Sequence, residues 1–139
     1  SAPVHGIPLY KMGAGFIKLF LGNEGVLLKK AFEENPVAIG GFERLDTSVI
    51  LASKGRLIAK VGAEGLCIIV NPEEKEALVV KIIDSDMKAR SIVVIESLKQ
   101  LGWLSESEIL SSDLGKIGSL EVKDSQGNLV GWIETLFKI

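Results

Sequence analysis

Hydrophobic residues recur with the period of an α-helix at the start of the chain. This pattern predicts a helix over residues 10–21 and a second helix that begins after the N-cap Asn23 and ends before Pro36. The apolar stripes of the two helices are Met12, Phe16, Leu19 and Phe20, and Leu27, Leu28, Ala31 and Phe32. The chain is therefore expected to open with an αα pair.

The middle of the chain changes to short apolar runs rich in β-branched residues. Asp46 is placed to cap a short helix over residues 47–52. Three strands are predicted after this helix, over residues 56–61, 66–70 and 77–83. Residues 71–76 are polar, so they predict the turn of an antiparallel hairpin between the second and third strands.

A long helix and a second hairpin complete the pattern. Residues 84–86 offer N-caps for a helix over residues 87–101, and Gly102 is expected to end it. A single helical turn is expected within residues 105–118. Residues 120–137 predict a terminal hairpin because a polar, glycine-containing turn divides two apolar runs.

The order of these elements predicts an α+β fold, in which helices cover an antiparallel sheet. A chain of 139 residues with 47% hydrophobic residues can bury its own core, so residues 1–139 are expected to form a single domain. The formal net charge of −2 and the lack of a long basic run argue against nucleic acid as a partner. Because the sequence has no apolar run of about 20 residues and no signal peptide, we expect a cytoplasmic protein that does not contact a membrane.

His5 and Cys67 are the only histidine and cysteine, and they are isolated in the sequence. A metal site normally needs several such ligands at one point. Cys67 also lies within an apolar run, where a small buried side chain is the expected role. We therefore expect no metal ligand within this chain.

The stretch Lys60-Val61-Gly62-Ala63-Glu64-Gly65 is the first candidate for chemistry. Its lysine follows a strand-like run, and glycine lets a ligand's polar group approach the main chain closely. Glu64 is available to pair with Lys60 or to bind a substrate ammonium group. The residues alone leave a second interpretation open, a solvated surface lysine in a loop.

Two further groups of residues have alternative explanations in the pattern. Arg44, Asp46 and Thr47 are explained without a ligand by a helix cap at Asp46 with Arg44 as its surface partner. Ser85 and Lys88 match the Ser-x-x-Lys pattern of serine acyltransferases, but such short patterns recur by chance and an N-cap role explains Ser85.

Four stretches of this sequence together resemble the bacterial asparaginase II family, whose members are zinc-associated amidohydrolases similar in fold to glutaminases and serine β-lactamases. They are residues 2–9 (Ala-Pro-Val-His-Gly-Ile-Pro-Leu), residues 44–47 (Arg-Leu-Asp-Thr), residues 60–65 and residues 81–84 (Lys-Ile-Ile-Asp) followed by Arg90. The resemblance implies that the predicted sheet and helices form part of a β-lactamase/penicillin-binding-like fold.

The resemblance also implies roles for individual residues. Lys60-Val61-Gly62 is similar to the Lys-Thr-Gly on the inner strand of penicillin-recognising enzymes, so Lys60 would be the catalytic residue that holds the substrate carboxylate or polarises the oxyanion. Glu64 would receive the α-ammonium group of the substrate. The remaining substrate-binding residues implied are Gly62, Ala63, Gly65, Arg44, Asp46 and Thr47.

The resemblance places the other catalytic parts elsewhere. The nucleophilic Ser-x-x-Lys of that family lies upstream of the Lys60 strand, whereas Ser85 lies downstream. The nucleophile and the zinc-binding cysteines would therefore precede Ser1, and the chain would be the carboxyl-terminal portion of a larger enzyme with no cofactor of its own.

The expected function is that of part of an amidohydrolase, hydrolysing the side-chain amide of asparagine or a similar small amide through an acyl-enzyme. The alternative is a non-catalytic α+β binding or assembly module. Apolar surface that another segment would cover is expected to make the chain a homo-oligomer.

Overall fold

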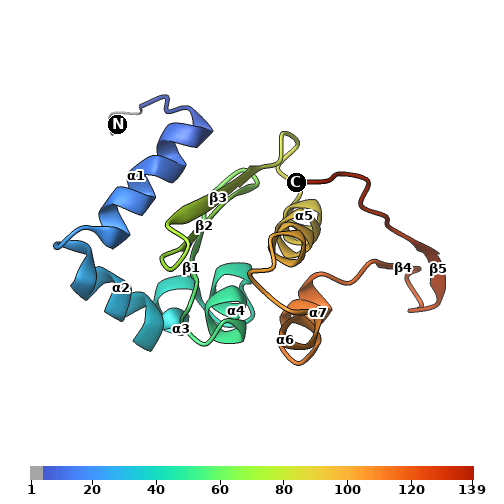
Figure 1. Cartoon of the computed structure of the whole chain (residues 1–139). Helices are drawn as coiled ribbons and strands as arrows, with labels where there is room; N and C mark the ends of the chain where they lie inside the picture. The colour runs from blue at the N-terminus through green and yellow to red at the C-terminus, as the bar shows by residue number, and fades with distance from the viewer. Residues whose placement is uncertain (1–4) are drawn as a thin grey trace.

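A three-stranded antiparallel sheet lies at the centre of the computed structural model, which describes residues 5–139 (Figure 1). Its strands are β1 (Ile58–Val61), β2 (Leu66–Asn71) and β3 (Glu76–Lys81), in the order β1-β2-β3. The central strand β2 is almost entirely apolar because both of its faces are covered. The expected hairpin of the second and third strands is confirmed, with Val70 opposite Ala77.

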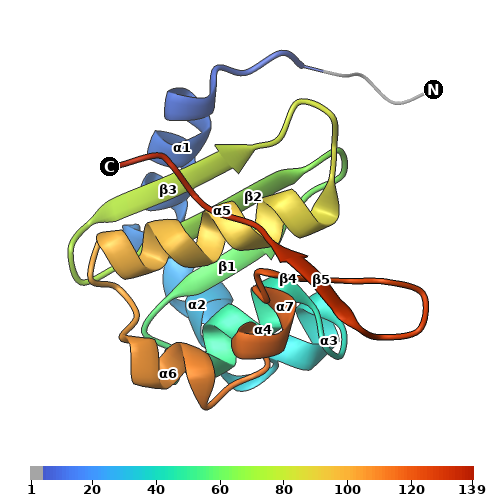
Figure 2. The same cartoon turned by 90° about the vertical axis from the view of Figure 1, so that its right-hand side faces the viewer.

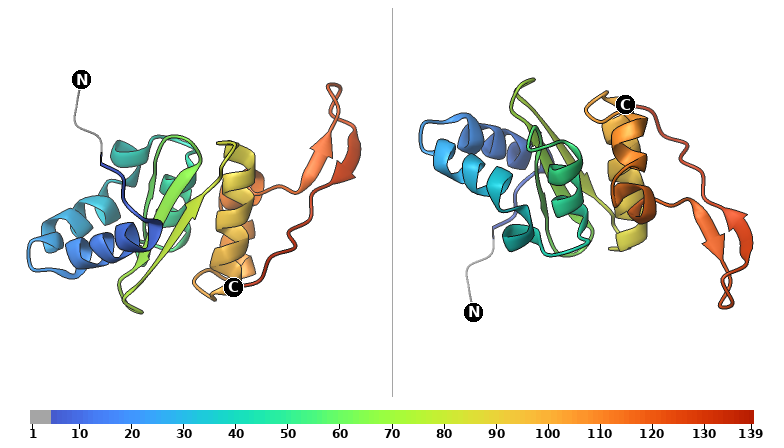
Figure 3. Two further views of the ribbon diagram at one scale, coloured as in Figure 1. Left: turned by 90° about the horizontal axis from the view of Figure 1, so that it is seen from above. Right: turned by 90° about the horizontal axis from the view of Figure 1, so that it is seen from below.

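Helices cover both faces of this sheet, so the predicted α+β fold is confirmed (Figure 3). On one face, α1 (Leu9–Leu21) packs against β3 and β2. From it, α2 (Gly25–Glu34) and α3 (Pro36–Gly40) lead to α4 (Leu45–Ala52), which packs against the edge strand β1. On the other face lies α5 (Met87–Gln100), followed by α6 (Glu106–Leu110) and α7 (Leu114–Ile117). The apolar core between these layers includes Phe20, Ile50, Leu57, Ile69, Leu98 and Trp103.

The first two helices form the predicted pair, but parts of their predicted apolar stripes are exposed. Phe20 and Phe32 make the contact between the helices, with ring centroids 5.3 Å apart. Leu19 is 44% exposed and Leu27 is 80% exposed. Because successive helical residues turn by about 100°, Leu19 and Leu27 point away from the faces that bury these two phenylalanines. The residue before α2 is Glu24, so the expected N-cap at Asn23 was wrong by one position.

Several element bounds differ from the predicted ones. β1 begins at Ile58 instead of residue 56, because Arg56 lies in a turn and pairs with Glu108. β3 ends at Lys81, because the chain turns there with the N–H of Ser85 donating to the Ile82 carbonyl. Between residues 105 and 118 there are two short helices where one turn was expected.

The terminal hairpin is confirmed and projects away from the helices (Figure 1). It consists of β4 (Glu121–Lys123) and β5 (Leu129–Trp132), so its second strand ends before residue 137, the predicted end. Residues 133–139 run as an extended tail across α5 (Figure 2). Val130 is 63% and Trp132 is 64% exposed. None of the helices in the described part of the chain has the length and apolarity to cross a membrane.

Candidate functional site

Lys60 and Asp46 form an ion pair between the end of β1 and the first turn of α4. The Lys60 Nζ lies 3.0 Å from Asp46 Oδ2. The Asp46 side chain is 1% exposed, whereas the Lys60 side chain is 38% exposed. The pair therefore has a buried anion and a cation that still reaches the surface.

Asp46 also binds the edge of the sheet. The N–H of Gly62 donates to the Leu66 carbonyl, so the alternation of an antiparallel ladder directs the N–H of Val61 away from β2. That N–H donates to Asp46 Oδ2 over 3.1 Å. The carboxylate thus occupies the place that the carbonyl of a further strand would take.

These contacts keep Asp46 ionised. Burial raises the pKa of the Asp46 carboxyl, but the hydrogen bond from the Val61 N–H and the hydrogen bond and charge of Lys60 more than offset it. The pKa of Asp46 is therefore held below its ordinary value of 3.8. The carboxylate is a constant partner for the ammonium group at neutral pH.

The lowered pKa of Asp46 predicts a pH dependence of stability. A carboxyl whose pKa is lower in the folded state contributes stability above its unfolded pKa, and this contribution is lost as the pH falls through the folded pKa. The difference in unfolding free energy between the wild type and Asp46→Asn should therefore be largest above about pH 5 and shrink below about pH 4. Urea denaturation across this range measures it, and a difference independent of pH would contradict it.

Thr47 and Gly40 hold the connection from α3 to α4 against this pair. The Thr47 hydroxyl donates to the Gly41 carbonyl over 2.7 Å. A Cβ atom at Gly40 would lie 2.9 Å from Asp46 Oδ1 and 2.4 Å from Thr47 Oγ1, so only glycine lets the main chain pass there. The sequence reasoning missed Gly40, although the Gly40-Gly41 pair was a usable signal.

The expected cap at Asp46 was wrong. Helix α4 begins at Leu45 with Arg44 as the N-cap residue, so Asp46 lies inside the first turn. Within residues 5–139 the ion pair of Asp46 is with Lys60, and the expected surface partnership with the exposed Arg44 is not found. The tertiary contact with β1 outweighs the local capping preference.

The turn that follows β1 is tight, and its last two residues have left-handed main-chain conformations. Glu64 has a φ of 55° and Gly65 a φ of 71°. The main-chain carbonyl of Glu64 accepts a hydrogen bond from Lys81 Nζ, while the Glu64 side chain is exposed. Of the two roles open to Glu64, pairing with Lys60 is not found within residues 5–139, because the carboxylate that binds Lys60 is that of Asp46. A role of Glu64 toward a substrate ammonium stays a prediction.

Cys67 is buried beside this site, as its apolar surroundings predicted. Burial raises the pKa of its thiol to about 12, although the positive charges of Arg90 and Lys60 act in the opposite direction. His5, the first of the described residues, is exposed. Over residues 5–139 no three His, Cys, Asp or Glu side chains converge in a way that fits a metal ion.

Ser85 and Lys88 do not form a nucleophile and base pair. The N-cap of α5 is Asp86, whose carboxylate accepts from the Ala89 N–H, so the cap role expected for Ser85 was wrong. Lys88 Nζ donates to the Glu121 carbonyl over 3.2 Å. The literal Ser-x-x-Lys match therefore has no counterpart in the geometry.

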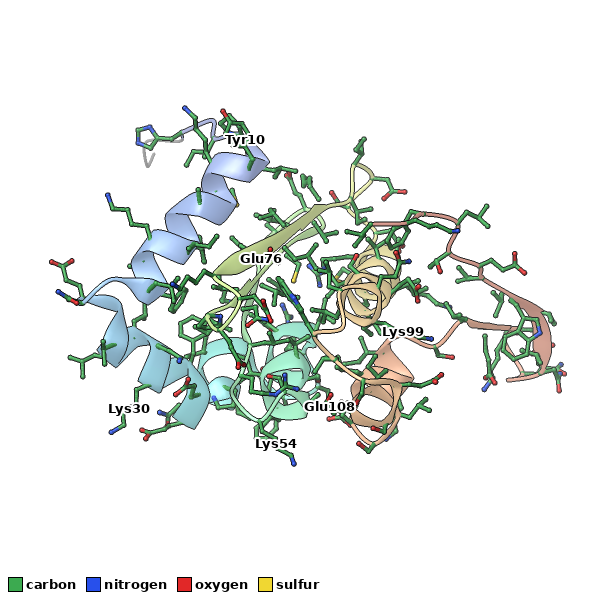
Figure 4. The ribbon with its side chains drawn as sticks, in the orientation of Figure 1. Tyr10, Lys30, Lys54, Glu76, Lys99 and Glu108 are labelled. Carbon is green, nitrogen blue, oxygen red and sulfur yellow. The ribbon has the colours of Figure 1, made fainter. Side chains whose placement is uncertain are left out.

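A groove of about 740 Å³ lies between α4 and the short helices α6 and α7. Lys54 and Glu108, both labelled in Figure 4, lie on its border. Glu108 is bound by Arg56 and by Ser105, and these contacts occupy its carboxylate. Neither Lys60 nor the turn of residues 62–65 lines this groove.

A search of curated proteins gives no significant match to this chain. A scan against models of protein families gives a match to L-asparaginase II over residues 1–135, nearly the whole sequence. The match includes Asp46, Lys60 and the turn of residues 62–65. The chain belongs to the L-asparaginase II family.

Proposed function

We propose that this chain supplies the wall of the active site against which an asparaginase-type amidohydrolase holds its substrate. The proposed reaction is hydrolysis of the side-chain amide of asparagine or a similar small amide. The observation that carries the proposal is the Lys60–Asp46 pair at the edge of β1, followed directly by the glycine-containing turn of residues 62–65. Membership of an asparaginase-type amidohydrolase family supports it.

The hydrogen bonds of Lys60 define what its ammonium group can do. An ammonium group has three N–H donors. One bonds Asp46 and one bonds the Val61 carbonyl over 3.2 Å. These two bonds fix the direction in which the remaining N–H of the ammonium group points. In the proposed site it polarises the amide carbonyl, or stabilises the oxyanion that forms from it, without a cost of reorganisation.

The other proposed residues divide by exposure. Glu64 and Arg44 are exposed, so their charged groups are assigned to the α-ammonium and the carboxylate of the substrate. Ala63 is exposed beside Glu64, so its main chain is available to the substrate, whereas Gly62 and Gly65 act by letting the turn close against Leu66 and Ile82. Asp46 and Thr47 are buried, and in this proposal they act by holding Lys60 and the Gly40–Gly41 turn.

The attacking hydroxyl is proposed to come from another segment of the intact enzyme, where it would form the acyl-enzyme with the amide carbon and release ammonia. Ser85 is unsuitable for this role because the lysine of its motif, Lys88, donates to the Glu121 carbonyl and not to the Ser85 hydroxyl. The second candidate, a binding or assembly module, is favoured by the exposed Val130 and Trp132 on the projecting hairpin.

Protein made from the whole reading frame tests the proposal by release of ammonia from asparagine and glutamine. Lys60→Ala should lower kcat/KM by about a hundredfold, the effect of losing one preorganised donor to an oxyanion. Lys30→Ala is the matched control, because Lys30 is an exposed lysine of α2 whose ion pair with Glu34 is a surface pair (Figure 4).

Two results would contradict the proposal. One is whole protein that releases no ammonia from either amide. The other is a Lys60→Ala variant that is folded, as judged by circular dichroism, and as active as Lys30→Ala. Either result would leave the assembly module as the better description.

A further inference from the structure

Arg90 is a buried cation that the proposed role of Lys60 leaves unexplained. It lies in the first turn of α5 and is 6% exposed. Its guanidinium Nη1 donates to the Gly62 carbonyl over 3.3 Å. Its Nε is buried and has no hydrogen-bond partner among the described residues.

None of the ion pairs found within residues 5–139 includes Arg90. A buried cation without a partner is costly, and the amino-terminal turn of a helix is an unfavourable place for positive charge. The cost of placing a charge here indicates that the arginine contributes something that an apolar side chain could not.

Its contact with Gly62 shows what that contribution is. Gly62 and Leu66 continue the β1–β2 ladder, and the N–H of Gly62 donates to the Leu66 carbonyl over 2.9 Å. The return bond is missing, because the N–H of Leu66 donates to the Ala63 carbonyl instead, over 3.3 Å. The Gly62 carbonyl thus loses its partner in the ladder, and Arg90 replaces it from α5.

Arg90 brings a second cation to this end of β1. Lys60 is paired with Asp46, whereas Arg90 is in none of the ion pairs of residues 5–139, and the exposed carboxylate of Glu64 lies on the turn that follows β1. The field of Arg90 reaches the neighbouring strand, because it acts to lower the pKa of Cys67, which lies opposite Val61. Arg90 therefore adds buried positive charge beside the Gly62 carbonyl, in addition to the ammonium group of Lys60.

We propose that Arg90 is a positioning residue for the substrate-facing end of β1. Its guanidinium fixes the Gly62 carbonyl, and its charge favours an anionic group at that end, either the carboxylate of the substrate or that of the acid product. The second part of this inference rests on the proposed function. The first part rests only on the hydrogen bonds of Gly62 and Leu66.

The test compares Arg90→Met, which removes the charge and the donor, with Arg90→Lys, which keeps the charge, in protein made from the whole reading frame. Arg56→Met is the matched control, because Arg56 also donates to a main-chain carbonyl, that of Trp103, and lies outside the proposed site. Three quantities are measured: KM and kcat for asparagine, the inhibition constant of aspartate, and amide hydrogen exchange at Gly62 and Val80.

Arg90→Met should raise KM for asparagine and weaken inhibition by aspartate by about tenfold, which is the size of one lost charge-assisted interaction. The change in kcat should be smaller. Exchange at Gly62 should accelerate by a similar factor while exchange at Val80 stays unchanged. Arg90→Lys should recover aspartate inhibition to within about threefold of the wild type, and Arg56→Met should change none of these quantities.

The inference is overturned if Arg90→Met equals Arg56→Met in aspartate inhibition and in exchange at Gly62, or if it only lowers stability. If Arg90→Met does not fold, Arg90→Gln replaces it, because glutamine keeps a donor without the charge. If the wild type hydrolyses no amide, the proposed function fails and exchange at Gly62 alone decides whether Arg90 positions the strand end.

Discussion

Asp46→Ala is expected to lower the free energy of unfolding by about 3 kcal/mol. The substitution leaves the Val61 N–H without its acceptor inside the protein and takes away the carboxylate that binds Lys60. Breaking a buried pair by removing one partner typically costs about 3–5 kcal/mol. We expect the lower end of this range because the Lys60 side chain is 38% exposed and regains water.

Urea denaturation of the variant measures this loss. Glu34→Ala is the control, because the Glu34 side chain is 60% exposed and its pair with Lys30 has a separation of 3.7 Å. That control should change stability by less than about 0.5 kcal/mol. The double variant Asp46→Ala, Lys60→Met should recover part of the loss, because methionine leaves no uncompensated charge. A loss from Asp46→Ala no larger than that of the control would show that the pair is not structural.

The elements that the sequence predicts best are those in which local pattern and burial agree. Residues 66–70 are apolar and include three β-branched residues, and they form the central strand with only one residue added. The long helix is predicted to within one residue, because its cap at Asp86 and its stop near Gly102 are both local signals. Such elements need no knowledge of distant contacts.

The candidate site is less accessible to sequence reasoning, because its central contact is tertiary. Lys60 was identified from its own strand and turn, but its partner lies 14 residues away on another element. The local pattern favours a cap role for Asp46, and only the packing of α4 against β1 redirects the carboxylate to the sheet edge. The Gly62 carbonyl, whose partner is Arg90 on α5, has no sequence signal for the same reason.

Gly65→Ala is expected to destabilise the protein by about 3 kcal/mol and to displace the turn that follows Lys60. A Cβ atom at Gly65 would lie 2.7 Å from the Ile82 carbonyl oxygen, which is main chain and cannot rotate away. Relieving this contact requires movement of the turn against β3, where the N–H of Ile82 donates to the Gly65 carbonyl over 3.1 Å. The φ of 71° adds the cost of a left-handed conformation for a residue with a side chain.

Gly102→Ala separates the two costs, because Gly102 has nearly the same φ, 70°, but no atom within 4 Å of the added Cβ. The free energy of unfolding of Gly102→Ala should fall by only about 1 kcal/mol, which is the conformational cost alone. Urea denaturation of the two variants measures the difference, which is the steric part of the Gly65 effect. Equal losses would mean that the turn can move freely against Ile82, and the turn would then lack the rigidity needed to hold a substrate beside Lys60.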